Sequence, residues 1–414
     1  MPSLYICVFI LVALCALITL IKPDSDKYLY YICFAVMTVF LALRYGQGTD
    51  YAGYLEIYHQ AKEAFDPEYG LQFFLRRTHT EIGWKLLMIL LYGLKIDFQI
   101  FVVVLSLIMM FFTNKFIEQY CGAYKTTALV LLYPTVYLTY YFSGWRQGIA
   151  MAIFFGILLK KLLDKKYIYY VVVVVLLCTI HKSALIYFAA PLIILVKDKW
   201  IKYLFAICAI FSGLMIFEPT RNLVYRISLM IGAGKSYFSA ATVTISWFSL
   251  LEKLVMFGII LILWFMRDEQ KDKDDQIKAI LKVYCLNLMI YICLLTSPAG
   301  AGRLSIMFKM AEVILIPMLL SRVKVRIRNA AVLLIVMIST VMSYKNIAFY
   351  SEGYFKEINA WNYPYITIFN QQDALLYRNE AIKIYEDRPY DFYESDYMWE
   401  QSDALGEFTN EMCR

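Results

Sequence analysis

Charged residues are scarce in this sequence: they make up 18% of its 414 residues, whereas soluble domains carry about 25%. A soluble globular fold is therefore excluded. Hydrophobic residues account for 61% of the chain and recur in long runs along most of its length. Because helices satisfy their own backbone within such runs, the sequence predicts an all-α, polytopic membrane protein.

Metal-ligating residues are also scarce. The chain has three His, far apart in the sequence, and nine Cys with no C-x-x-C pair, so we expect no metal site. Most of the Cys lie inside apolar runs, where they pack as small hydrophobes. The formal net charge of +7 comes mainly from Lys and Arg in short loops, so it indicates membrane orientation and not a nucleic-acid partner.

The apolar runs predict about 12 transmembrane helices. Clusters of Lys and Arg at 160–166, 197–202, 267–278 and 322–328 separate pairs of runs, and the positive-inside rule places these clusters in the cytoplasm. The first run lacks a basic start and a cleavage site, so we keep it as a span and not as a signal peptide. The predicted spans are 3–21, 28–43, 98–113, 126–142, 145–160, 167–181, 184–196, 203–217, 247–266, 279–297, 304–320 and 329–343.

This topology predicts one membrane domain, residues 1–344, with both termini outside. Loops 44–82 and 218–246 are extracytoplasmic, the second as a helix on the membrane surface, and an extracytoplasmic tail follows at 345–414. The short run 82–94 is predicted as a re-entrant or interfacial helix. If it crosses the membrane instead, the N-terminal part inverts.

The first polar motif is R-Y-G-Q-G-T-D-Y at 44–51, where two Gly permit a tight turn. Arg44 offers a planar fork for phosphate, and Asp50 offers a carboxylate for sugar hydroxyls or for orienting Arg44. The alternative is an Arg–Asp pair that only closes a turn. Tyr51 and Tyr54 share one helix face, and we expect them to bind sugar rings.

The second motif is S-G-W-R-Q-G-I-A at 143–150, which joins two apolar runs. Arg146 lies at the membrane boundary and at a helix N-terminus, where free N–H groups and positive partial charge suit an anion. Arg146 and the adjacent Gln147 are therefore candidates for phosphate binding, and Trp145 for sugar binding. The alternative is an Arg that reaches the headgroups and anchors the helix.

Three further residues are candidates. Glu81 opens an apolar helix, where it either favours the helix dipole or acts as a base. His181, in H-K-S-A, is a candidate general base near neutral pH, although a lone His is usually structural. Arg303, after a turn of small residues, repeats the arrangement of Arg146. Farther along, Lys309 and Glu312 are spaced to pair within a span.

The predicted topology brings these polar residues to one face, whereas unrelated structural residues would scatter over both. Such a face has cations for phosphate and a carboxylate and an imidazole for proton transfer. Outside the cytoplasm it has no ATP, so a substrate already activated on a lipid carrier fits best. The residues are Arg44, Asp50, Glu81, Arg146, His181 and Arg303.

At these motifs the chain resembles the EpsG family of bacterial polysaccharide polymerases, which is related to the Wzy-type O-antigen and capsule polymerases. R-Y-G-x-G-T-D-Y at 44–51, E-x-G-W at 81–84, S-x-x-R-Q-x-x-A at 143–150 and H-x-S-A at 181–184 carry the resemblance. It implies a bacterial inner- or plasma-membrane glycosyltransferase with a fold like that of lipid-carrier-dependent (GT-C-like) enzymes. Such an enzyme joins repeat units held on undecaprenyl pyrophosphate, without metal or nucleotide sugar.

On this interpretation the partners are the undecaprenyl-pyrophosphate-linked oligosaccharide, membrane lipids, and a chain-length regulator and flippase of the same pathway. A flippase of lipid-linked saccharide and a membrane acyltransferase are the alternatives. A flippase predicts pseudo-symmetric halves and charges near mid-membrane. The expected roles are base or sugar orientation for His181, Glu81 and Asp50, pyrophosphate binding for Arg146, Arg303, Arg44 and Gln147, and sugar binding for Tyr51, Tyr54 and Trp145.

Overall fold

The computed structural model describes residues 4–48, 50–77, 80–230, 243–269, 271–349 and 365–370. Most of the predicted tail 345–414 and residues 231–242 of the predicted loop 218–246 lie outside these ranges. Within them the chain is helical, and β-pairing is limited to one isolated bridge between Arg44 and Thr367. The prediction of an α-helical membrane protein is confirmed.

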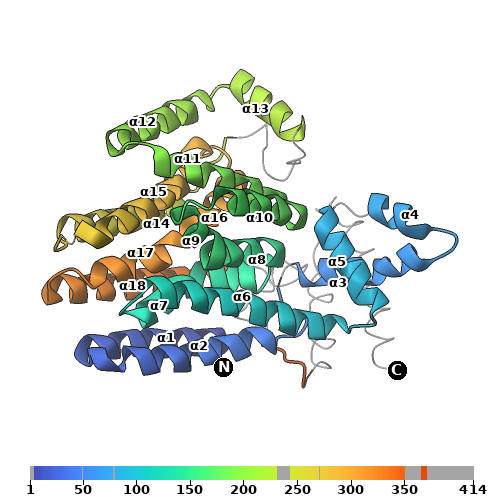
Figure 1. Ribbon diagram of the computed structural model, residues 1–414, viewed down its shortest axis with the longest axis horizontal. Helices are drawn as coiled ribbons and strands as arrows, with labels where there is room; N and C mark the ends of the chain where they lie inside the picture. Colours follow the sequence, from blue (N-terminus) through green and yellow to red (C-terminus); the bar gives the residue numbers. More distant parts are fainter. Residues whose placement is uncertain are drawn as a thin grey trace, which may run out of the picture.

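The long helices lie side by side along the long axis of the molecule, from α1 and α2 at one edge to α12 at the other (Figure 1). Three short helices, α3 to α5, project from one end of this bundle, and we call residues 51–93 the lobe. The helices are α1 (Leu4–Ile21), α2 (Asp26–Ala42), α3 (Tyr51–Gln60), α4 (Gly70–Arg77), α5 (Ile82–Gly93), α6 (Phe98–Tyr120), α7 (Lys125–Leu132), α8 (Trp145–Ile153), α9 (Leu159–Leu163), α10 (Tyr167–Ile180), α11 (Ala189–Leu195), α12 (Asp198–Leu214), α13 (Glu218–Met230), α14 (Trp247–Phe265), α15 (Lys271–Cys293), α16 (Pro298–Lys309), α17 (Ala311–Leu320) and α18 (Val325–Phe349).

Among the described residues, five helices are long and apolar enough to cross a membrane: α1, α6, α14, α18 and the part of α15 from Asp275 onward. A sixth span results if α12 and α13, which meet at an angle of 107°, form one broken crossing. Several other predicted spans are present as shorter or interrupted helices. The count of about 12 therefore stays a prediction.

Two π-helices bracket α8. The first, η3 (Tyr133–Tyr141), continues α7 without a break, and the second, η4 (Phe154–Leu158), joins α8 to α9. Pro134 lies in the first turn of η3, where it has no N–H to give to the α-helical ladder. Because π-helical turns are rare and concentrate at functional sites, they draw attention to α8 and to the turn before it.

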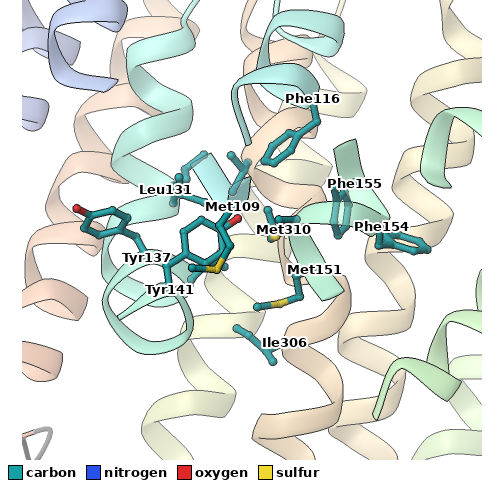
Figure 2. Close-up of a cluster of buried hydrophobic side chains, with 14 of the residues drawn as sticks. Met109, Phe116, Leu131, Tyr137, Tyr141, Met151, Phe154, Phe155, Ile306 and Met310 are labelled. Carbon is teal, nitrogen blue, oxygen red and sulfur yellow. The ribbon is translucent and has the colours of Figure 1, made fainter. Parts of the chain in front are cut away.

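A shared core holds α8 against both halves of the chain. Met151 of α8 lies among Met109 of α6, Tyr141 of η3 and Met310, which follows α16 (Figure 2). All four side chains are at most 1% exposed. Their packing places the N-terminal ends of α8 and α16 together, since Gln147 at the start of α8 donates to the carbonyl of Arg303 at 2.7 Å.

Candidate active site

Three of the predicted residues meet at the base of the lobe. Glu81 accepts a hydrogen bond from the Arg146 guanidinium through Oε2 and one from the Lys182 backbone N–H through Oε1, at 2.9 Å. The Nδ1 atom of His181 lies 3.8 Å from the same Oε1. The structure thus brings Glu81, Arg146 and His181 from three distant parts of the sequence into what we call the polar centre.

Gly83 explains how Glu81 reaches this position. A Cβ atom on Gly83 would lie 2.8 Å from the carbonyl oxygen of Thr179 and would also overlap its hydroxyl. Only glycine therefore lets α5 approach the last turn of α10 this closely. Since His181 follows that turn directly, the Gly of E-x-G-W sets the distance between Glu81 and His181.

Substituting Gly83 with Ala is expected to push α5 away from α10. Displacement of Glu81 by about 1 Å lowers activity by about 100-fold where catalytic groups need exact alignment. Gly53→Ala is the matched control, because Gly53 lies on α3 of the same lobe and a Cβ there would meet nothing within 4 Å. Equal activity of the two variants, measured per folded protein, would contradict this role of Gly83.

The first motif supports the turn that carries Arg146. Gly48 has φ +100°, and a Cβ there would overlap the carbonyl of Phe142 and lie 3.1 Å from the Cα of Ser143. The backbone N–H of Asp50 donates to the Ser143 hydroxyl at 3.3 Å. R-Y-G-x-G-T-D-Y and S-G-W-R-Q therefore form one packed unit.

Arg44 lies inside this unit and is fully buried. Its guanidinium donates to the carbonyl of Leu41, to Ser106 Oγ at 2.9 Å and to the carbonyl of Tyr141 at 3.1 Å. Each of these partners belongs to the protein, and the side chain has no exposed surface. Arg44 therefore lies inside this unit and supports the turn before α8, and its role in pyrophosphate binding stays a prediction.

The aromatic residues assigned to sugar binding are also buried. Tyr51 is 5% exposed, Tyr54 4% and Trp145 0%. The Tyr54 ring packs on the Trp145 ring at 4.8 Å between centroids, and its hydroxyl accepts from Arg146 Nε at 3.4 Å and donates to Asp50 Oδ2 at 3.3 Å. Tyr54 thus contacts both Arg146 and Asp50, and the role of these rings in sugar binding stays a prediction.

Arg303 extends the polar centre toward α16. Its side chain is exposed, and its backbone is tied to Gln147. Gln147 is buried and connects the two helix N-termini, and its role in phosphate binding stays a prediction.

Electrostatics keep His181 neutral. The pKa of His181 is lowered to about 4, first by burial and then by the charges of Arg146 and, more weakly, Arg303, while Glu81 opposes them. Both ring nitrogens are buried without a hydrogen-bond partner among the described residues. A neutral imidazole can accept a proton, so His181 is available as a general base, although its low pKa makes it a weak one.

A second polar cluster lies deeper in the bundle. Lys309 forms ion pairs with Glu252 of α14 and with Glu312, the latter at 3.5 Å, and neighbouring Lys253 donates to Asn287 of α15 at 2.8 Å. The predicted Lys309–Glu312 pair is confirmed. Sequence reasoning missed Glu252, although two adjacent charges inside the apolar run 247–266 are a signal for such a cluster.

No three His, Cys, Asp or Glu side chains in the described ranges are grouped so that they could hold a metal ion. The polar centre itself offers a guanidinium, a carboxylate and a neutral imidazole.

Comparison with known proteins gives one finding. The model of the EpsG family matches residues 27–367, a range that contains every residue of the polar centre and of the deeper cluster. Neither characterised proteins nor solved structures give a significant match.

Proposed function

Since the chain belongs to the EpsG family, the family of Wzy-type polysaccharide polymerases, we propose that it joins undecaprenyl-pyrophosphate-linked oligosaccharide repeat units. The observation that carries this proposal is the polar centre, where Arg146, Glu81 and His181 meet at one end of a membrane bundle. We place this end on the extracytoplasmic face of the bacterial plasma membrane. The proposed fold has about 12 crossings and resembles GT-C-like glycosyltransferases.

Arg146 and Arg303 bind the pyrophosphate of the donor in this proposal. When the bond between the sugar and the pyrophosphate breaks, negative charge grows on the leaving group, and fixed cations stabilise it. Glu81 holds the Arg146 fork through an ion pair. The N-terminal ends of α8 and α16, joined by Gln147 and the Arg303 carbonyl, add positive partial charge at the same place.

His181 acts as the base in this proposal. The two Glu81 oxygens are already engaged by Arg146 and Lys182, whereas the His181 ring nitrogens have no hydrogen-bond partner in the part of the chain that the structure describes. The acceptor hydroxyl gives its proton to His181 while the hydroxyl oxygen attacks the anomeric carbon of the donor sugar. Undecaprenyl pyrophosphate leaves with the bonding electrons. Asp50, exposed and held by Tyr54, orients a sugar hydroxyl.

The low pKa of His181 predicts the pH dependence of the reaction. A base with a pKa of about 4 stays neutral at every pH above about 5, so the rate should not fall as pH drops through 6.5, the ordinary range for His. His181→Ala should lower the rate by about 100- to 10,000-fold. Initial rates between pH 5 and 8 check both, and a wild-type midpoint near pH 6.5 would argue against this base.

The decisive assay uses the purified protein in lipid nanodiscs. An undecaprenyl-pyrophosphate-linked repeat unit from the same gene cluster is supplied without nucleotide or metal, and the products are separated on a gel. A ladder of multiples is the expected result. Product that stays a single unit would refute the polymerase.

One observation favours a flippase as the second candidate. The cluster of Lys309, Glu252 and Glu312 places charges inside the bundle, as transport pathways often do. A sidedness assay in liposomes separates the two functions: a flippase moves the lipid-linked unit across the bilayer without lengthening it.

A further inference from the structure

The lobe contains a cavity of about 530 Å³ that the proposed reaction does not use. Its lining includes Lys62, Phe65, Asp66, Tyr69, Phe73 and Tyr92. A volume of this size lies within the range of small-molecule sites, which are about 300–1,000 Å³. None of these residues belongs to the polar centre.

The lining combines open aromatic faces with charged groups. Phe65 is 56% exposed, Tyr69 49% and Phe73 41%, in contrast to the buried rings beside Arg146. Lys62 and Asp66 are exposed beside them. The C–H face of a pyranose packs on an aromatic ring, while its hydroxyls exchange hydrogen bonds with a carboxylate and an ammonium group.

The rings are held in place before any ligand binds. Phe65 stacks on Tyr92 at 6.1 Å between centroids and lies against Gly93, where a Cβ would come within 2.8 Å of its ring. Tyr69 packs on Phe73 at 4.8 Å. A preformed ring surface loses little conformational entropy when a sugar binds.

The cavity is connected to the polar centre through α3. Tyr54 on α3 contacts Arg146, and α3 runs on into η2 (Ala61–Phe65), which forms part of the cavity lining. From Tyr54 to Ala61 the helical rise is roughly 10 Å. Packed rings bridge the same interval, with Phe98 against Tyr58 at 5.5 Å and Tyr58 against Tyr92 at 5.7 Å between centroids.

We propose that this cavity is a saccharide subsite, which binds sugars of the substrate a few residues from the reacting bond. The inference rests on the proposed polymerase function and names where its oligosaccharide lies. A saccharide fits better than an anionic lipid surface, because the charged groups of the lining are one ammonium and two carboxylates (Lys62, Glu63 and Asp66), and anionic headgroups repel the carboxylates.

The test compares short and long substrates with the variant Phe65→Ala/Tyr69→Ala. Loss of two stacking rings is expected to raise the KM for a lipid-linked oligomer of several repeat units about 10-fold. The KM for coupling two single repeat units should rise much less, because single units extend less far from the reacting bond. Phe65→Tyr/Tyr69→Trp, which keeps the ring faces, should restore long-chain synthesis.

Tyr203→Ala is the control, since Tyr203 lies on α12 and is 50% exposed; it should behave as wild type. If Phe65→Ala/Tyr69→Ala raises the KM equally for short and long substrates, or for neither, the proposed subsite is wrong. A binding experiment tests the cavity without polymerisation. Saturation-transfer NMR measures whether the carrier-free oligosaccharide binds to the wild type and to Phe65→Ala/Tyr69→Ala. Binding by wild type alone supports the subsite even if no ladder forms, and equal signals from both proteins contradict it.

Discussion

Arg146→Ala is expected to lower the rate of polymer formation by about 100- to 1,000-fold, the loss typical of removing one fixed group that stabilises developing negative charge. The substitution also leaves Glu81 without its guanidinium partner, so the carboxylate beside His181 is no longer neutralised. The measurement is the initial rate of dimer formation in nanodiscs. Unfolding temperatures of variant and wild type establish that both proteins are folded.

Arg146→Lys should recover only part of this loss, because an ammonium group keeps the charge but not the two-pronged geometry. Arg226→Ala is the matched control: Arg226 is an exposed Arg on α13 and contacts nothing in the polar centre. If Glu81 acts by holding Arg146, the effects of the two substitutions on the rate should not be independent. The double variant Glu81→Gln/Arg146→Ala should then lose less activation free energy than the sum of the losses in the two single variants. Wild-type polymer from folded Arg146→Ala protein would exclude the pyrophosphate role.

Lys309→Met is expected to destabilise the fold by about 3–5 kcal/mol, the usual cost of removing one partner from a buried charge pair. Lys309 is 4% exposed and Glu312 2%, so without the ammonium group the carboxylates of Glu252 and Glu312 stay buried with no cation between them. Thermal unfolding in nanodiscs measures the loss. Lys278→Met provides the comparison, since the side chain of Lys278 is 42% exposed and lies 4.0 Å from an exposed Asp275 carboxylate.

A second variant separates lost charge balance from lost packing. Lys309→Met combined with Glu252→Gln removes one charge of each sign, so it should recover part of the stability that Lys309→Met loses. If Lys309→Met and Lys278→Met change the unfolding temperature equally, the deeper cluster does not hold the bundle together.

The sequence motifs predicted the residues of the polar centre because each lies at the end of an apolar run. Apolar runs mark where helices end, and the positive-inside rule groups those ends by side. Gly83 and Gly48 in the same motifs now have a physical reason: each permits a backbone contact that a side chain would block.

The packing of the aromatic residues could not be predicted in the same way. The spacing of Tyr51 and Tyr54 shows that they share a helix face, but it does not reveal that this face packs on Trp145. Arg44 raises the same difficulty. A guanidinium at a helix end can turn toward water or toward Phe142 and Trp145, where it lies 5.2 Å from each ring, and only the tertiary packing decides.

The π-helix η3 sets the register between α7 and the turn that precedes α8. A π-helix accommodates an extra residue within a helical path, and each residue turns an α-helix by about 100°. The π-helical stretch Tyr133–Tyr141 therefore rotates the end of this helix relative to α7. Without it, Tyr141, whose carbonyl accepts a hydrogen bond from Arg44 and whose hydroxyl pairs with Thr113, would face another side of the helix, while the apolar character of the span stayed the same. The contacts of this helix end thus depend on the number of residues as well as on their type.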